Sequence, residues 1–427
     1  MMPLSAVRQM KDSGIDWVGQ VPSHWSVRPF YSFAAEVDHP NTGLKEKNLL
    51  SLSYGRLVRK DMDRLEGLTP ASFEGYNIIE ANDIVFRLTD LQNDKTSLRS
   101  ARSPERGIIT SAYVTVRPSA SPRFFEYLMR AYDTTKVFYG IGGGIRQSMK
   151  FDDLKRLPVL VPTVSEMDAI ASHLDRATTR IDALVAKKTR FIELLREKRQ
   201  ALITHAVTKG LDRDVAMKDS GVEWLGVVPA HWDVVQSRRL FSERNEKARA
   251  DDQQLTASQK YGLLPQAEFM EREGRRIVVV QKGHDILKRT LPGDFVISMR
   301  SFQGGLELSE YEGSVSSAYV PITPIKWVVP AYFRWAFKSI TYIQALQATS
   351  DLVRDGQALR FENFTKVPLP HVPVDEQIAI ADFLDRATTR IDTLIAKTER
   401  SIELLREHRT ALITAAVTGK IDLRPAA

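Results

Sequence analysis

The residues that enzymes commonly use for bond chemistry do not occur in this sequence at the spacings that such chemistry needs. No Gly-x-x-x-x-Gly-Lys-Ser/Thr segment is present to cradle a nucleoside triphosphate, and the single Gly-Lys pair is Gly419-Lys420. The Asn/Asp-Pro-Pro-aromatic motif of amino methyltransferases and the Pro-Asp start of a common nuclease core are also absent. The eight histidines form no His-Glu-x-x-His motif, and there is no cysteine. The sequence therefore predicts a chain without a catalytic site or a metal site of its own.

Composition limits the class of protein further. The chain has 427 residues, of which 43% are hydrophobic and 26% charged, as in a soluble globular protein of two or three domains. No apolar run is long enough to predict a membrane span, and the N-terminus lacks the apolar region of a secretory signal. The absence of cysteine permits a reducing cytoplasm.

The net charge of +7 is concentrated in two segments, residues 174–210 and 384–420. Two interpretations are open: both segments present solvated faces of long helices, or they create a positive field for a polyanion or an acidic partner.

One unit of about half the chain occurs twice in the same order. A short signature reads MKDSGIDWVGQVPSHW at residues 10–25 and MKDSGVEWLGVVPAHW at residues 217–232. A second block reads LDRATTRIDALVAK at residues 174–187 and LDRATTRIDTLIAK at residues 384–397. The tryptophans of the two signatures are predicted to fill a small hydrophobic core, and His24 and His231 to be packed or hydrogen-bonded. The repeat predicts two similar scaffolds.

The stretches between these blocks, residues 26–160 and 233–371, diverge and show a mixed α/β pattern. Strand-like runs occur at residues 83–88 and 295–299, and Pro122 and Pro330 each open an amphipathic helical pattern. These stretches are predicted to be two versions of one fold with different surfaces.

A long helix is predicted in each copy, at residues 165–208 and 375–418, where neither Pro nor Gly interrupts the chain. At about 1.5 Å per residue, each helix would span on the order of 66 Å. The apolar residues recur at heptad spacing, which predicts a coiled-coil seam between the two helices. We assign the following residues to that seam: Leu174, Ile181, Leu184, Leu195, Leu384, Ile391, Leu394 and Leu405.

The fold class predicted from these elements is α/β, with two similar mixed domains, two long antiparallel helices and a pseudo-two-fold repeat. The short link 209–216 and the short tail 419–427 predict a pseudo-circular molecule, in which helix two ends near the first signature. The predicted segments are residues 1–161 and 213–372 for the two domains, and residues 162–212 and 373–427 for the helices.

The repeated signature, the variable stretch and the long helix together resemble the DNA-specificity (S) subunit of Type I restriction–modification systems. The second copy carries that family's Pro373-Val-Asp-Glu376-Gln377 sequence, whereas the first copy departs from it with Met167 after Glu166. The resemblance covers essentially the whole chain.

The resemblance implies a function without catalysis. The variable stretches, called reader 1 and reader 2 below, would be target recognition domains that each read one half of a bipartite site on double-stranded DNA. The helices would fix the spacing between half-sites and dock two methyltransferase (M) subunits. S-adenosylmethionine would bind to the M subunits, ATP and Mg²⁺ would bind to partner subunits including the motor-nuclease (R) subunits, and the complex would work in a bacterial or archaeal cytoplasm.

Reading of bases needs polar side chains that reach base edges, and Arg, Lys, Gln and Asn are the types that do so. In reader 1 the candidates follow the strand-like run at Asp83 or lie in the hairpin after the glycine cluster: Arg87, Gln92, Asn93, Lys95, Arg99, Arg102, Arg146, Gln147 and Lys150. In reader 2 the candidates are Arg300, Ser301, Gln303, Arg354, Gln357 and Arg360, with Gly304-Gly305 expected to let the backbone approach DNA. A solvated surface role is the alternative for each of them.

Two other functions fit the repeat: a two-headed coiled-coil scaffold that binds only proteins, and a transcription regulator with internal repeats. The nearly neutral charge of the two readers favours the scaffold, and the pairing of matching helices with diverged readers favours bipartite DNA recognition.

Overall fold

The computed structural model describes residues 9–61, 72–89, 98–140, 149–274, 276, 286–298, 301–349 and 359–423. The chain divides into two compact units. Unit 1 comprises Met1–Lys188 and Arg400–Ala427, and unit 2 comprises Thr189–Glu399. This division differs from the four segments predicted from the sequence, because each long helix contributes one part to each unit. Within the described ranges, no helix is both long and apolar enough to cross a membrane.

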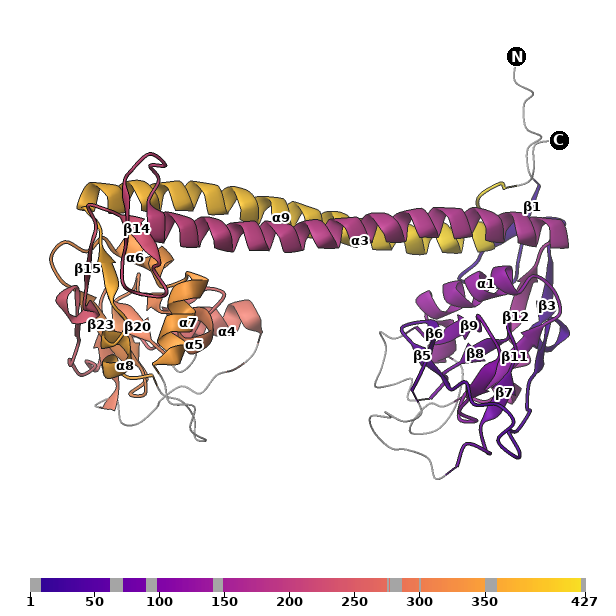
Figure 1. The fold of residues 1–427 in the computed structure, drawn as a ribbon. Coiled ribbons are helices and arrows are strands. Elements are labelled where there is room, and N and C mark those ends of the chain that lie inside the picture. The colour runs from indigo at the N-terminus through magenta and orange to yellow at the C-terminus, as the bar shows by residue number, and fades with distance from the viewer. Residues whose placement is uncertain are drawn as a thin grey trace, which may run out of the picture. The chain divides into compact units, whose positions relative to one another are not determined.

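In unit 1 the signature forms a hairpin that packs against the C-terminal end of the second long helix (Figure 1). Strand β1 (Met10–Asp12) pairs antiparallel with β2 (Gln20–Pro22), and Trp25 is fully buried. Gly419 follows helix α9 (Val374–Val417) with a positive φ of 73°, and a Cβ atom there would lie 2.5 Å from Pro22 Cδ. The C-terminal end of α9 therefore meets the first signature, as the pseudo-circular arrangement predicts.

The core of reader 1 is a four-stranded antiparallel sheet with both faces covered. Its order is β4 (Ala34–Glu36), β11 (Val114–Pro118), β8 (Ile84–Phe86) and β9 (Ser100–Arg102). In β8, Ile84 and Phe86 face one hydrophobic cluster and Val85 faces another, because successive side chains alternate across a strand. Helix α1 (Pro122–Thr134) and residues of α3 (Val164–Lys209) fill the first cluster (Figure 1). Pro122 opens α1, as the sequence predicts.

Smaller elements complete reader 1 and join its two ends. The second cluster involves β5 (Leu50–Ser53) with β6 (Arg56–Arg59), and β7 (Asn77–Ile79) with β10 (Gly107–Ile109). Strand β3 (Ser26–Pro29) pairs with β12 (Pro158–Val161), from Ser26 opposite Val161 to Pro29 opposite Pro158. The boundaries of reader 1 therefore lie in one ladder. The remaining short helices are η1 (Phe30–Ser32), η2 (Val137–Gly140) and α2 (Phe151–Leu154).

Unit 2 repeats this order of strands. Its signature hairpin is β13 (Met217–Asp219) with β14 (Val227–Pro229), and Trp232 is fully buried. Its central sheet has the order β16 (Phe241–Glu243), β23 (Val320–Pro324), β20 (Phe295–Ile297) and β21 (Glu307–Leu308). The other strands and helices of reader 2 are β15 (Asp233–Val235), β24 (Leu369–His371), β17 (Leu255–Ser258), β18 (Gly262–Pro265), β19 (Lys288–Thr290), β22 (Gly313–Val315), η3 (Ser237–Arg239), α4 (Gln266–Glu273), α5 (Ser301–Gly304), α6 (Pro330–Ala336), α7 (Ile340–Ala348) and α8 (Phe361–Thr365).

The two long helices run antiparallel within each unit, as predicted. In unit 1, Arg409 Nε lies 3.0 Å from Asp182 Oδ1. In unit 2, the equivalent pair joins Arg199 Nε to Asp392 Oδ1 at 2.9 Å, and Arg196 pairs with Glu399. Residue numbers rise along one helix as they fall along the other in these pairs, so the helices have opposite directions.

The seam between the helices agrees with the predicted one except at one position of each helix. Its buried and half-buried positions are Leu174, Thr178, Ile181, Val185, Lys188, Ile192, Leu195, Arg199, Leu202 and Ala206 on α3, and the residues 210 positions later on α9. The prediction that Leu184 and Leu394 are buried is wrong: their side chains are 42% and 41% exposed. Leu174, Ile181, Leu195, Leu384 and Ile391 are buried, and Leu405 is half-buried. The error has a physical reason: apolar residues occupy two neighbouring helix positions, and only packing selects one of them.

Two adjacent leucines of α3 test this seam. Leu195 is buried in the seam, whereas Leu194 is exposed. We expect Leu195→Ala to lower the unfolding free energy by about 2–5 kcal/mol, and Leu194→Ala to change it by about 0.5 kcal/mol or less. Thermal and urea unfolding of the two variants would measure the difference. Equal losses in both variants would contradict the seam described here.

Candidate nucleic-acid interface

Arg87, Arg102 and Lys150 lie at the surface of reader 1, close to the sheet. Arg87 is half-buried just after β8. Arg102 is bound on both sides, because its Nε donates to Glu126 Oε2 at 2.9 Å and its Nη1 to Asn82 Oδ1 at 2.9 Å. Lys150 precedes α2 with an exposed side chain. Of these three residues, Arg87 and Lys150 are therefore the better placed to contact DNA.

Arg99 does not reach the surface, so its prediction as a base-reading residue is wrong. It is fully buried, and its backbone N–H donates to Asp133 Oδ2 at 2.5 Å. Its guanidinium donates to Tyr139 Oη at 3.3 Å and to the carbonyl oxygen of Thr89 at 3.1 Å. The side chain of Arg99 therefore ties the end of the segment that contains Gln92 to the α1–η2 region of reader 1.

The candidate residues of reader 2 are also partly buried and partly exposed. Ser301 is fully buried, and its Oγ accepts a hydrogen bond of 2.8 Å from Ser298 N, so its prediction as a DNA contact is wrong. Gln303 and Arg360 are exposed. A Cβ atom on Gly305 would lie 1.9 Å from the Phe337 carbonyl oxygen. Gly305 therefore allows a close approach to the C-terminal end of α6, rather than to DNA.

The remaining candidates lie outside the described residues, but the structure brings the flanks of their segments together. In reader 1, Met149 N donates to the Leu88 carbonyl oxygen at 2.9 Å. In reader 2, Gln347 donates to the Phe302 carbonyl oxygen. In each reader, described residues that flank the two segments therefore lie together. The candidates outside the described residues are Gln92, Asn93, Lys95, Arg146, Gln147, Arg300, Arg354 and Gln357.

A carboxylate near the start of each long helix holds the signature against that helix, and it was not predicted from the sequence. Glu166 of α3 accepts a hydrogen bond from His24 Nε2 at 2.9 Å and one from Trp25 Nε1 at 3.4 Å. In unit 2, Glu376 accepts the equivalent bonds from His231 at 2.6 Å and Trp232 at 3.0 Å. The prediction that both histidines are packed or hydrogen-bonded is confirmed, because both are hydrogen-bonded. The recurrence of His-Trp and of Glu in both copies was the signal for this contact.

The difference between the copies at Met167 is local. In unit 2 the side chain of Gln377 donates to the carbonyl oxygens of Trp327 and Val372, and accepts from Val329 N. In unit 1 Met167 is buried in the hydrophobic cluster, and Ser121 Oγ bonds Asp168 instead at 2.9 Å. The helix begins at the same place in both copies, as the sequence analysis expects.

The carboxylate of Glu166 makes the stability of unit 1 depend on pH. Burial acts to raise its pKa, but hydrogen bonds from His24, Thr163 and Trp25 outweigh burial and lower that pKa below the ordinary value of 4.5. A carboxylate with a lowered pKa stabilises the fold above the pKa of the unfolded chain, and this contribution is lost as the pH falls through the folded value.

We expect Glu166→Gln to cost about 1–3 kcal/mol at pH 7, because its donors lose a charged acceptor. The difference from the parent protein should shrink as the pH falls below 4.5, where the parent's carboxylate becomes protonated. Urea unfolding between about pH 3 and pH 7 measures both effects. Glu193→Gln, an exposed carboxylate on the same helix, is the control and should have a small effect at every pH. A loss for Glu166→Gln that is the same at all pH values would contradict this assignment.

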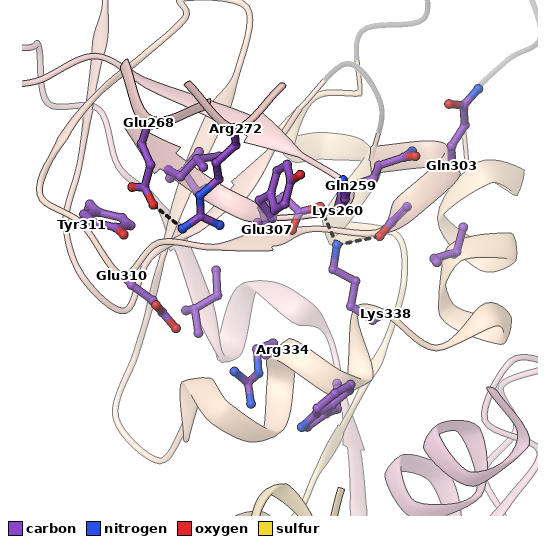
Figure 2. A pocket seen from close by; sticks show the side chains of 18 of the residues that line it. Gln259, Lys260, Glu268, Arg272, Gln303, Glu307, Glu310, Tyr311, Arg334 and Lys338 are labelled. Atoms are coloured by element: carbon purple, nitrogen blue, oxygen red, sulfur yellow. Dashed lines mark hydrogen bonds and ion pairs between the residues drawn. The ribbon is translucent and has the colours of Figure 1, made fainter. Parts of the chain in front are cut away.

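A cleft of about 640 Å³ lies in unit 2 between the reader and the helix α3 (Figure 2). Tyr261 of the β17–β18 turn and Tyr311 line one part of it, and Arg199 of α3 and Trp335 of α6 line another. Lys338 points across the cleft and donates to the Gly304 carbonyl oxygen at 2.9 Å and to Glu307 at 2.5 Å.

Comparison with known proteins identifies the fold. The chain is similar to a chain in a solved structure that describes complex assembly and conformational transition of the type I R-M system. The TM-score is 0.69 and the identity 13%, and the match covers 94% of this chain and 99% of the other. It is also similar to the HsdS subunit from Thermoanaerobacter tengcongensis, with a TM-score of 0.55, 13% identity and coverage of 94% and 98%. No family model and no curated protein matches the sequence.

These likenesses extend over nearly the whole chain. The chain therefore has the fold of a specificity subunit of Type I restriction–modification systems, including the two long helices.

Proposed function

We propose that this chain is the DNA-specificity subunit of a Type I restriction–modification complex. One observation carries the proposal: two units with the same order of strands have diverged readers, while the helices that join them share most of their residues. A protein that reads two different half-sites with one geometry needs this combination. The fold similarity over 94% of the chain supports it.

In this proposal each reader contacts one half-site through the region where its two candidate segments meet. Side chains such as Arg87 in reader 1 and Arg360 in reader 2 would contact bases or phosphates there. Arg99 would act by holding its segment in place, because its guanidinium is buried.

The chain would contribute recognition, and its partners would contribute chemistry. Two methyltransferase subunits would bring S-adenosylmethionine, and motor-nuclease subunits would bring the ATP and Mg²⁺ chemistry of the complex. Among the described residues no cluster of three or more His, Asp or Glu side chains could hold a metal ion.

Exposed leucines on the long helices offer a docking surface for the methyltransferase subunits. Unit 1 contains Leu184 and Leu404, and unit 2 contains Leu394 and Leu194. In the repeat, Leu394 is the counterpart of Leu184, and Leu404 is the counterpart of Leu194, each 210 positions later. An apolar side chain that is exposed at the same position of both copies favours a partner that binds twice. We call these four leucines the docking leucines.

We expect Leu184→Asp and Leu394→Asp each to remove one of two bound methyltransferase subunits, because a buried, unpaired carboxylate opposes docking. The double variant should bind none. Native mass spectrometry of the full-length chain with its methyltransferase measures the stoichiometry. Ile325→Asp, at an exposed apolar residue of reader 2, is the matched control and should keep two subunits. Full binding by the double variant would place the docking surface elsewhere.

The function itself is tested by mapping DNA methylation in cells that carry the complete system. We expect one bipartite motif with a fixed spacer. Gel shifts with the purified complex should then show that affinity depends on the spacing between the two half-sites. A chain that assembles with its partners but leaves no bipartite motif, and shifts no DNA, would instead be the two-headed protein scaffold.

A further inference from the structure

A tyrosine followed by glycine stands at the same hairpin turn in both readers. In reader 1, Tyr54-Gly55 forms the two-residue turn between β5 and β6. In reader 2, Tyr261-Gly262 closes the turn between β17 and β18. The readers diverge over most of their length, so a shared pair at this turn needs a shared cause.

The fold of reader 1 does not need the Tyr54 side chain. It is 87% exposed, and its backbone has a φ of 47°. A non-glycine residue in this left-handed region is strained by an amount on the order of 1 kcal/mol, and Asn or Gly would be preferred in such a turn. Gly55 has a different reason, because its φ of 73° lies in the left-handed region that glycine adopts without strain.

The turn of reader 1 lies beside the long helices. Arg56, the next residue after the turn, has its Nη2 atom 3.9 Å from Asp182 Oδ2 on α3. Asp182 is also held by Arg409 of α9. Leu184, one of the docking leucines, follows Asp182 by two residues on the same helix. The exposed tyrosine therefore lies beside the helix that carries Leu184.

The turn of reader 2 also lies beside the long helix α3. Lys260, Tyr261 and Gly262 line the cleft together with Arg199 and Gln200 of α3. The Tyr261 ring lies 4.6 Å from Lys260 Nζ and 5.2 Å from the Arg272 guanidinium carbon. Trp335 has Arg199 and Arg334 over its ring at 5.7 and 5.1 Å. Tyr, Trp and Arg are the residue types that most often dominate protein–protein binding.

We propose that the Tyr-Gly turn of each reader is a second contact for the methyltransferase subunit that docks on the helices. This inference rests on the proposed function. The two half-sites on DNA have different bases, whereas two copies of one methyltransferase are identical. A turn that is kept in both readers therefore fits the methyltransferase, which is the same partner for both readers.

The DNA backbone is also the same at both half-sites, but the charges in the cleft argue against the DNA backbone as the partner of the turns. Each cation that lines the cleft already has a carboxylate partner in this chain, which reduces the field that a phosphate would require. These pairs are Lys260 with Glu273, Arg272 with Glu268, Lys338 with Glu307, Arg199 with Asp392 and Arg334 with Asp385.

The experiment is a titration of the full-length chain with its methyltransferase subunit in the absence of DNA. Tyr54→Ala and Tyr261→Ala are compared with Tyr31→Ala, which removes another exposed tyrosine of reader 1. We expect each turn variant to weaken one of the two binding steps by about tenfold, as for an interface tyrosine. Tyr31→Ala should bind like the parent. Thermal melting should stay unchanged for Tyr54→Ala, because that ring is exposed.

Two results would overturn the inference. Parental binding by both turn variants with and without DNA would leave the turns without a role. A defect that appears only with DNA present, while methyltransferase binding is intact, would assign the turns to the DNA backbone. Failure of the proposed function looks different, because the parent chain itself would then bind no methyltransferase.

Discussion

Exchanging reader 1 for that of another protein of the same fold will change one half of the methylated DNA motif and leave the other half intact. The expected effect is large, because specific sites are bound about 10³–10⁷ times more tightly than nonspecific DNA. The physical reason is that each reader has its own hydrophobic cluster. A change of side chains in reader 1 therefore leaves the core of reader 2 as it was.

The structure determines where this exchange must be cut. Ser26 pairs with Val161 at the end of the β3–β12 ladder, so residues 26–161 should be replaced together. The donor must also keep apolar residues against Ile170 and Leu174 of α3, which complete the cluster. Exchange of residues 233–371, which carry the β15–β24 ladder, is the matched experiment for the other half-site. A motif in which one exchange alters both halves would contradict independent readers.

Lengthening both long helices by one heptad will lengthen the spacer between the half-sites. Duplicating residues 185–191 of α3 and 395–401 of α9 adds seven residues to each helix and keeps the phase of the seam. Seven residues add about 10.5 Å, or about three base pairs at ~3.4 Å per pair. We therefore expect the methylated motif to gain about three base pairs between unchanged half-sites.

Duplicating only one of the two segments is the control for this experiment. The seam on one helix would then be out of step with the other, so we expect lower thermal stability rather than a new spacer. The motif is measured by methylome sequencing, and stability by melting of the purified chain. An unchanged spacer in a stable protein with both duplications would show that the helices do not set the distance.

Several features of this protein follow from the sequence alone, for reasons that are local. The long helices were predicted at residues 165–208 and 375–418 and lie at Val164–Lys209 and Val374–Val417. They were predictable because helix formation depends on uninterrupted residues with a regular apolar period. The repeat itself predicted two similar units and the meeting of the C-terminal end of α9 with the first signature.

The sequence did not decide every position of the helix seam. Leu184 and Val185 are apolar neighbours; Leu184 was predicted in the seam, but it is exposed and Val185 is half-buried. Burial depends on which face meets the other helix, and that choice is made by contacts between residues about 200 positions apart, such as Arg199 with Asp392.

The division between binding and structural residues was also decided by tertiary structure. Arg99 and Ser301 have the polar side chains expected of DNA contacts. However, Tyr139 and the Thr89 carbonyl oxygen hold the Arg99 guanidinium inside reader 1, and Ser298 holds the Ser301 hydroxyl inside reader 2. Conversely, Glu166 became important only when folding placed it within 2.9 Å of His24, which lies 142 positions away. The sequence by itself determined the elements, the repeat and the absence of catalytic motifs, because these depend on neighbours along the chain. Only the tertiary structure decided which side chains are buried and which remain available, because burial depends on residues that folding brings together.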